Sequence, residues 1–389
     1  MAFAALHAFY SSPGQTFCIG LFVAAFGEAF GMSPASIGAL YLGATLASAG
    51  TLLFVGHWID HMRLVHFSAA VIVGLSVACF VTAAAPGPAG LFVGIYLLRL
   101  TGQGLMVHVE ATSTARTFDR DRGRALGITA LGLPLGEVVF PPLVVAGIAA
   151  IGWRPTYALI GAVALLVLLP LTQWLLYGIT RSPRSEGAGN GAFKRLIVGL
   201  KMVVGSRYVW CVLPAMAILP FYSTAIMFHI TNIAAIRGWS GGLVAASFPV
   251  LAVASVVGLF VSGYIIDRTS ARRLFVFHPI PFLCGFAVLG AVSASWALPV
   301  AFALFGVTGG IAKTTFTAMW AEAFGVDMLG TVRSAVSMYM VLMTALAPFV
   351  LGTALAAGMS IGAIVAWGIA IAVVLMVPSG FAERYVPAR

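Results

Sequence analysis

The chain has 389 residues, of which 61% are hydrophobic and 8% are charged. Soluble domains carry ~25% charged residues, so this chain has too little charge to cover a soluble surface of its size, and lipid must be its solvent. The net charge of +10 could indicate nucleic-acid binding, but most lysines and arginines stand in short clusters between apolar runs. That distribution is typical of membrane-protein loops, so the composition argues against a nucleic-acid partner and predicts an all-α protein of the bilayer.

Apolar runs of about 20 residues recur along the chain, and short polar breaks separate them, as in transmembrane helices. They predict about 12 spans, although two adjacent runs could also be one broken helix. The expected spans cover residues 4–30, 34–58, 66–85, 90–115, 125–149, 155–178, 209–234, 241–265, 274–294, 297–322, 332–357 and 361–380.

The cations are distributed unequally between the two sides of the predicted membrane. Seventeen lysines and arginines stand in the breaks after even-numbered spans or at the C-terminus, against two in the breaks after odd-numbered spans. Cytoplasmic loops carry the excess of cations. We therefore expect a multi-pass protein of the cytoplasmic (inner) membrane with both termini in the cytoplasm. The two remaining cations, Arg99 and Lys313, lie inside spans.

The longest break, residues 180–208, is rich in Gly, Ser and Arg. Such a composition predicts a flexible cytoplasmic linker, with a surface helix possible over 193–204. The linker divides the chain into a six-helix bundle over 1–179 and a second over 209–389.

The two halves match at one fixed offset of 207 residues. Gly56-His-Trp-Ile-Asp60 corresponds to Gly263-Tyr-Ile-Ile-Asp267. The same shift pairs Thr101-Gly102 with Thr308-Gly309, Pro13 with Pro220, Gly123 with Gly330 and Pro141 with Pro348. Five ungapped matches indicate an internal duplication. A parallel repeat of six spans places the substrate path between the halves, near the bilayer midplane.

The duplicated motif resembles the loop motif of the major facilitator superfamily, in which Gly, three residues and Asp-Arg precede a basic cluster. The second copy reads Gly263, Asp267, Arg268, Arg272 and Arg273, and the first keeps Gly56, Asp60 and Arg63, with His61 in place of the usual arginine. Arg99-Leu-Thr-Gly102-Gln-Gly104 is similar to a further segment of the family. The resemblance implies 12 helices in two pseudo-symmetric bundles and secondary active transport by alternating access.

The loop motif also has a physical interpretation as a gate. Its glycine lets two helices approach closely, and a carboxylate is stabilised at the start of a neighbouring helix. We expect Asp60 to meet the start of the eleventh span near Arg333, and Asp267 to meet the start of the fifth near Arg124. Each pair would hold the cytoplasmic side closed. The alternative is that these charges simply face water at span ends.

Charges inside spans are expensive and therefore indicate functional sites. Arg99 and Lys313 are expected to give the cavity a positive potential that attracts an anionic group of the substrate. The counterpart of Lys313 at the 207-residue offset is Met106, so the halves differ here. Other candidates to line the cavity, each of which could equally face a neighbouring helix or the membrane interface, are Tyr10, Gln15, Tyr222, His229, Trp320 and Tyr339.

Three titratable residues are candidates for proton coupling. Glu137 lies near the middle of the fifth span, where a carboxyl group can take up and release a proton; a static Glu137–Arg99 ion pair is the alternative. Glu110 follows Arg99 by 11 residues, about three turns along the same face of an α-helix, with His108 nearby. Glu110 could instead be interfacial.

These features predict a proton-coupled transporter of a small organic anion. An exporter of amphipathic compounds, an importer of a metal such as copper or of a vitamin, and a receptor without transport activity are the alternatives. An enzyme is not expected, since no nucleophile–base set, metal motif or phosphate loop stands out.

We expect a monomer whose partners are its substrate, protons and the bilayer, with no cofactor and no metal. His57 and His61, with Asp60 beside them, form only a weak metal-binding pattern.

Overall fold

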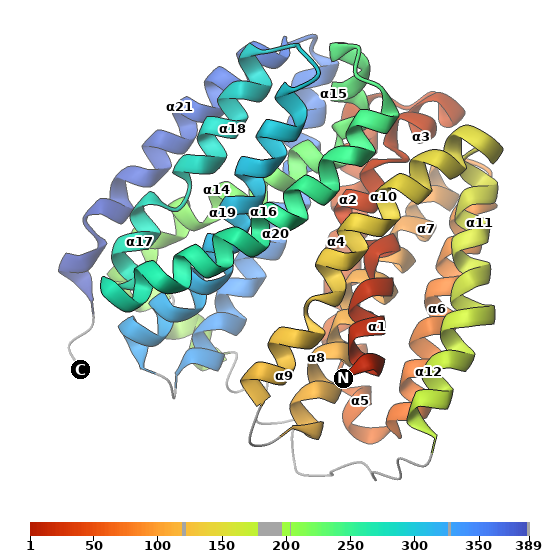
Figure 1. Cartoon of the computed structure of the whole chain (residues 1–389), viewed down its shortest axis with the longest axis horizontal. Coiled ribbons are helices and arrows are strands. Elements are labelled where there is room, and N and C mark those ends of the chain that lie inside the picture. The colour runs from red at the N-terminus through yellow and green to blue at the C-terminus, as the bar shows by residue number, and fades with distance from the viewer. Residues whose placement is uncertain (119–121, 178–196, 203, 326–327, 387–389) are drawn as a thin grey trace. The chain divides into compact units, whose positions relative to one another are not determined.

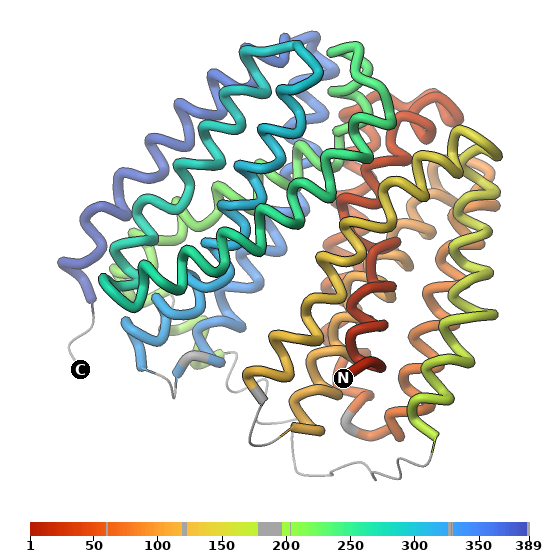
Figure 2. Tube along the Cα trace, viewed as in Figure 1, coloured from red at the N-terminus to blue at the C-terminus, as the bar shows by residue number. Residues whose placement is uncertain are grey.

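The computed structural model describes residues 1–118, 122–177, 197–202, 204–325 and 328–386, without the side chains of Asp60, Arg122 and Leu329. Throughout these residues the regular elements are helices (Figures 1 and 2). Two compact units divide the chain: residues 1–188 with 227–232 form unit 1, and residues 189–226 with 233–389 form unit 2. The predicted surface helix over 193–204 lies partly outside the described residues, and residues 197–202 are helical.

The helices of unit 1 come from the first half of the chain. They are α1 (Ala2–Tyr10), η1 (Ser12–Gly14), α2 (Thr16–Gly20), α3 (Val23–Phe30), α4 (Pro34–Val55), α5 (Trp58–His61), α6 (Leu64–Ala83), α7 (Pro88–Leu98), η2 (Arg99–Met106), α8 (Val107–Thr117), α9 (Arg122–Thr129), α10 (Gly132–Ile151), α11 (Trp153–Val163), η3 (Ala164–Leu168) and α12 (Leu169–Leu176). The segments η2 and η3 are π-helical, and η1 is a 3₁₀ turn.

The helices of unit 2 follow the linker. They are α14 (Arg207–Phe228), α15 (Ile230–Arg237), α16 (Gly241–Arg268), α17 (Ala271–Phe277), α18 (Ile280–Ala291), α19 (Ala297–Phe324), α20 (Leu329–Ala356), α21 (Ile361–Gly380) and the 3₁₀ helix η4 (Ala382–Tyr385). The end of α14 and the start of α15, residues 227–232, belong to unit 1.

Eleven stretches of the described chain are long and apolar enough to cross a membrane. The first predicted span, residues 4–30, is not one of these eleven. It is divided among α1, η1, α2 and α3 (Figure 2). Pro13 contributes to the first interruption, because its ring nitrogen has no hydrogen to donate to the preceding turn. The interruption leaves backbone groups free of α-helical bonding inside a span, which is tolerated where protein surrounds them.

Serine residues define the start of four spanning helices. Ser33, Ser240, Ser270 and Ser360 each accept a hydrogen bond of 3.2 Å from the backbone N–H three residues later. The side chain thereby satisfies one of the first N–H groups of α4, α16, α17 or α21, which have no partner within the helix.

Small residues control how closely the helices of unit 1 approach one another. A Cβ atom added to Gly136 of α10 would overlap the Ser12 hydroxyl and lie 2.9 Å from the Phe9 carbonyl oxygen, and one on Gly132 would lie 2.8 Å from the Ala8 methyl group. Helix α10 therefore packs directly on the backbone of the first span. Dispersion contacts of this kind hold helices together in lipid, where helix association gains little from the hydrophobic effect.

The break between α14 and α15 is seated on the first span within unit 1. The Thr231 hydroxyl donates to the Gly20 carbonyl oxygen and accepts from the Ala24 N–H, each at 3.2 Å. The Phe228 and Tyr41 rings lie 4.5 Å apart. Sequence periodicity predicted one continuous span over 209–234, but the helix is interrupted at His229.

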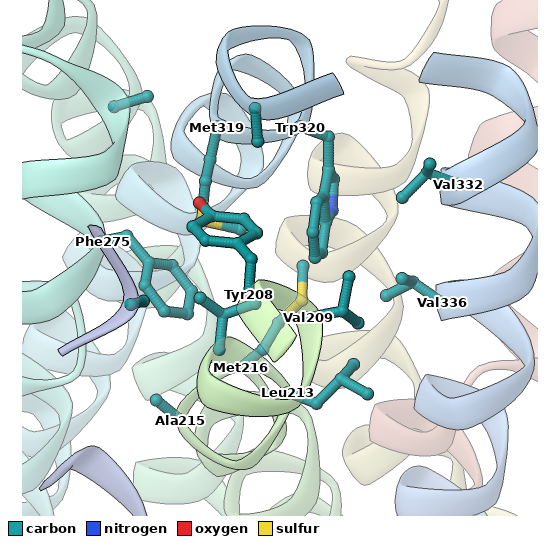
Figure 3. Packing of buried hydrophobic residues seen from close by; sticks show 14 of the residues in the cluster. Tyr208, Val209, Leu213, Ala215, Met216, Phe275, Met319, Trp320, Val332 and Val336 are labelled. Carbon is teal, nitrogen blue, oxygen red and sulfur yellow. The ribbon is translucent and has the colours of Figure 1, made fainter. Parts of the chain in front are cut away.

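The main hydrophobic cluster of unit 2 joins α14, α17, α19 and α20 (Figure 3). Trp320 is 1% exposed in this cluster, and its ring meets the Tyr208 ring edge-on at 6.2 Å. Trp320 was expected to line a substrate cavity. The structure instead gives it a packing role, because its large apolar ring fills the space between these helices.

We expect Gly136→Ala to lower stability by about 1–3 kcal/mol, because the added methyl group would overpack the contact between α10 and the first span. Thermal unfolding in detergent would measure the loss. The matched control is Gly309→Ala, since a Cβ there meets nothing within 4 Å. Equal melting temperatures for the two variants would contradict this prediction.

Candidate functional site

Arg99 lies at the centre of a polar site in unit 1. Its side chain is only 5% exposed, and it begins the π-helical segment η2. The Nη1 group donates to the Gly14 carbonyl oxygen and to the Thr16 hydroxyl, each at 3.4 Å, and the guanidinium lies 5.1 Å from the centre of the Tyr41 ring. These contacts of the buried cation are thus with neutral groups, a carbonyl oxygen, a hydroxyl and an aromatic ring.

Glycines make these contacts geometrically possible. A Cβ atom on Gly14 would lie 2.7 Å from the Gln103 backbone nitrogen, and one on Gly102 would lie 2.8 Å from the Gly14 Cα. Any larger residue would separate the interrupted first span from η2 and move the Gly14 carbonyl away from Arg99. The broken helix and the π-helical segment thus form one site, and both kinds of irregularity are frequent at functional positions.

Three buried polar atoms near this site have no hydrogen-bond partner among the described residues: Arg99 Nε, Gln103 Oε1 and Thr45 Oγ1. Gln103 follows Arg99 along η2, and Thr45 follows Tyr41 by one turn of α4. Buried polar groups are nearly always hydrogen-bonded, so a cluster of unsatisfied ones indicates a place for a polar ligand. Sequence analysis found Arg99 but missed Thr16, Tyr41 and Thr45, whose polar groups inside predicted spans were the available signal.

Three other candidates, on the first and seventh spans, have hydrogen-bond partners within the protein. The Tyr10 hydroxyl donates to the Ile160 carbonyl oxygen at 2.7 Å, so Tyr10, 6% exposed, fastens α1 to α11 rather than lining a cavity. The Gln15 amide donates to the Ser11 hydroxyl beside the Arg99 site. His229 is fully buried, and the Asn232 amide donates to its Nδ1 at 3.1 Å.

Glu110 is a buried carboxylate with neutral partners. The residue is 6% exposed. The Thr129 hydroxyl donates to Glu110 Oε1 at 2.5 Å, and the Thr114 hydroxyl donates to Thr129 at 3.3 Å. Among the residues that the structure describes, Glu110 forms no ion pair. This short hydroxyl chain connects α8 to α9.

The π-helical segment changes the predicted register of the fourth span. Because η2 has i→i+5 hydrogen bonds, it has more residues per turn than an α-helix. The count of 3.6 residues per turn, which placed Glu110 on the same face as Arg99, therefore does not apply to this span. His108 donates through Nε2 to the Gly56 carbonyl oxygen at 3.0 Å. His108 thus contacts the loop-motif glycine at the end of α4. Glu137 is half-buried on α10.

The predicted gating residues lie at helix ends. Arg63, Arg124, Asp267, Arg268 and Arg333 are exposed, and Arg268 stacks on the Tyr264 ring at 4.1 Å. The Asp60 side chain lies outside the described residues. The pairings of Asp60 with Arg333 and of Asp267 with Arg124 would each join one unit to the other, and they stay predictions.

An ion pair that sequence analysis missed lies in the second copy of the loop motif. Glu322 accepts from the backbone N–H groups of Ala271 at 2.8 Å and Arg272 at 3.3 Å, and it pairs with Arg272 Nε at 3.3 Å. A carboxylate at the N-terminus of α17 is stabilised by the helix dipole. The position of Glu322 at the end of a predicted span was the available signal.

The candidates of unit 2 lie in two different environments. Lys313 is exposed on α19, and its role toward an anion remains a prediction. Tyr222 and Tyr339 both line an apolar groove of about 470 Å³. The Tyr222 hydroxyl donates a hydrogen bond to the Gly368 carbonyl oxygen at 2.9 Å. The His57 and His61 rings lie 5.8 Å apart, and the described side chains contain no group of three or more potential metal ligands.

The spanning helices, with a buried cation and a buried carboxylate between them, define a polytopic membrane protein. A family model described as the Major Facilitator Superfamily matches residues 6–348, so the chain belongs to this family. The predicted resemblance and the all-α membrane fold are confirmed. As a family member the chain is a multi-pass membrane transporter of small molecules, not an enzyme.

Solved structures of transporters share this fold. A bacterial homologue of the human lysosomal transporter Spinster, inward-facing and unoccupied, is 16% identical with a TM-score of 0.71, over 99% of this chain and 96% of that one. The nucleoside transporter NupG is 12% identical with a TM-score of 0.75 over the full length of both chains, and its D323A mutant gives a TM-score of 0.79 over 98% and 99%. A comparison with curated proteins gives no match.

We expect Thr129→Val to destabilise the protein by about 1–3 kcal/mol, because the buried Glu110 carboxylate would lose its hydroxyl donor. Thr129→Ser keeps the hydroxyl and serves as the matched control. Thermal unfolding of both variants in detergent measures the effect. Valine and serine variants of equal stability would show that the hydrogen bond contributes nothing.

Proposed function

We propose that this protein is a proton-coupled secondary transporter of a small organic anion, which works by alternating access in the cytoplasmic membrane with both termini in the cytoplasm. The observation that carries the proposal is the buried Arg99. A charge inside a span is costly and is retained where it serves transport. The contacts of Arg99 with Gly14, Thr16 and Tyr41 are with neutral groups, and a substrate carboxylate or phosphate would supply the opposite charge.

The chemistry around Arg99 suits an anion with further polar groups. Its Nε and the neighbouring Gln103 Oε1 and Thr45 Oγ1 have no hydrogen-bond partner in the described chain. The guanidinium can donate two parallel bonds to a carboxylate or phosphate. Oxygen acceptors such as Gln103 Oε1 select a substrate that also carries a hydroxyl or an amine. Lys313, exposed on α19, would add positive potential from unit 2.

Coupling to protons is proposed for Glu137 and Glu110, with His108 as a further candidate. Glu110 has the clearer geometry, since it is buried, forms no ion pair among the described residues and accepts from a hydroxyl chain. A buried carboxyl group without a cation favours its neutral form, and a change of solvation during alternating access can release the proton. The loop-motif residues would act as gates, and the protein would function as a monomer.

A second candidate, transport of amphipathic compounds, is favoured by one observation. The groove that holds Tyr222 and Tyr339 has an apolar wall and no charged side chain among the described residues that line it. Such a groove cannot recognise an anion, but it can hold a hydrophobic group. The two candidates differ in which unit binds the substrate.

Arg99→Gln should lower the affinity for anionic substrates by about 1.5–3 kcal/mol, or roughly ten- to hundredfold, because the amide keeps hydrogen-bonding groups but loses the charge. Proteoliposome uptake of labelled carboxylates and organic phosphates would measure the loss, with nucleosides and sugars as neutral comparison compounds. Arg384→Gln, which removes an exposed charge near the C-terminus and outside the proposed machinery, is the matched control. Equal losses for anionic and neutral compounds would contradict anion recognition by Arg99.

Glu137→Gln and Glu110→Gln separate the two proposed coupling residues. The variant that removes the coupling group should keep substrate exchange across the membrane but lose accumulation driven by a pH gradient, because the amide cannot carry a proton. Uptake with and without the gradient measures both activities. Glu28→Gln, at an exposed position of α3, is the control. If both variants accumulate substrate normally, neither carboxylate couples protons.

A further inference from the structure

The apolar groove of unit 2 runs between three spanning helices. Its walls come from α14, α20 and α21, with contributions from α15 and α18, and its volume is about 470 Å³. The wall residues include Ala217 and Ile218 of α14, Met343 and Leu351 of α20, and Ile364 of α21. A volume of this size is typical of ligand sites, which range over ~300–1,000 Å³.

The internal duplication shows how the two halves differ at the position of this groove. In unit 1 the glycines 132 and 136 of α10 allow close contact with the first span. The residues 207 positions later are Tyr339 and Met343, and both line the groove. Bulky side chains thus stand where the first half has glycines, and they separate the corresponding helices. The groove is therefore a specific difference between two related halves.

Contacts conserved between the two halves support this comparison. Gly161 packs against Cys79 in unit 1, where an added Cβ would lie 2.9 Å from the Cys79 Cβ. Their counterparts at the same offset, Gly368 and Phe286, pack against each other in unit 2, with 2.6 Å from an added Cβ to Phe286 Cε1. The bundles are thus built alike on this side and differ at Tyr339 and Met343.

The open side of the groove is lined by exposed residues of two spanning helices. Val350, Trp367 and Ile371 line it and are 42%, 66% and 50% exposed. These residues lie within stretches that are long and apolar enough to cross a membrane. In a bilayer the surroundings of such residues are hydrocarbon, so the groove opens toward acyl chains rather than water.

The dimensions of the groove fit one extended acyl chain. Its wall includes Met359, in the turn between α20 and α21, and extends along α21 from Ile361 to Leu375. The 14 steps from Ile361 to Leu375 correspond to about 21 Å at ~1.5 Å per residue. The chains of one leaflet cover roughly half of a hydrocarbon core about 30 Å thick. The groove therefore reaches from helix ends, at a membrane surface, beyond the depth of one leaflet.

A cation lies at the same end of the groove. Arg237 ends α15, one turn after the lining residue Ile233. Its Nη2 group donates to the carbonyl oxygens of Leu289 at 2.9 Å and Gly290 at 2.6 Å, and Leu289 also lines the groove. A phospholipid whose chain enters here would place its phosphate near this positive charge, which is favourable at the membrane surface.

We infer that the groove of unit 2 binds an acyl chain of a membrane phospholipid, with its headgroup at the Met359 end near Arg237. The chain fills the space that the glycine contact between α10 and the first span closes in unit 1. This inference does not depend on the anion site at Arg99. It adds a lipid site to the second half of the transporter.

Photo-crosslinking of the full-length protein in phosphatidylcholine vesicles tests the inference. The probe is a phosphatidylcholine with a photoactivatable group at the end of one acyl chain, and mass spectrometry of the digested protein identifies the labelled residues. We expect labels on the inner wall of the groove, at Met343, Leu351 or Ile364. Labels confined to outward-facing residues such as Trp367 and Ile371 would indicate ordinary surrounding lipid and overturn the inference.

Two matched variants give a second test. Ala354→Phe places a ring in the groove wall, whereas Ala370→Phe adds the same ring at an exposed position of α21 outside the groove. We expect Ala354→Phe to abolish labelling of the inner wall and Ala370→Phe to leave it unchanged. Unchanged labelling in Ala354→Phe would overturn the inference. The wild-type map remains decisive if Ala354→Phe does not fold.

Discussion

The burial of the Arg99 guanidinium inside a span is the constraint on which the first half of this protein depends. A bare cation in hydrocarbon is costly, so the surrounding backbone must supply oxygen atoms. The interruption of the first span does this, since it directs the Gly14 carbonyl and the Thr16 hydroxyl toward Arg99. The absence of a Cβ at Gly14 and Gly102 then lets the two irregular segments meet.

The two units come from one duplicated sequence, but they carry different kinds of site. Unit 1 combines broken and π-helical segments with a buried cation and a buried carboxylate. Unit 2 continues α14 as a regular helix through Pro220, the counterpart of Pro13, and Gly306 occupies the position that matches Arg99. Close packing of α16 and α19 over glycines stabilises this half, and its apolar groove lacks the charged chemistry of unit 1. The division of polar and apolar sites between the halves follows from a few substitutions at matched positions.

Two of the side chains predicted to line a cavity have partners within the protein in this structure. The Tyr10 hydroxyl bonds to a backbone carbonyl, and Trp320 fills a hydrophobic cluster. A polar or aromatic side chain in a span has only two ways to be accommodated, by a partner within the protein or by a cavity. One sequence cannot distinguish them, because the partner is commonly more than 100 residues away, as Ile160 is from Tyr10.

The sequence by itself determined the membrane environment, the approximate spans, the duplication and the family resemblance, since each depends on local hydrophobicity or on motifs at fixed spacing. It also identified Arg99 and Glu110 as charges inside spans. Only the tertiary structure decided that the first span is broken, that η2 is π-helical and that Glu110 meets Thr129. These features depend on contacts between helices, where one missing Cβ or one distant hydroxyl selects the backbone geometry. The groove required both kinds of information, because the duplication supplied the comparison and the packing showed where the halves differ.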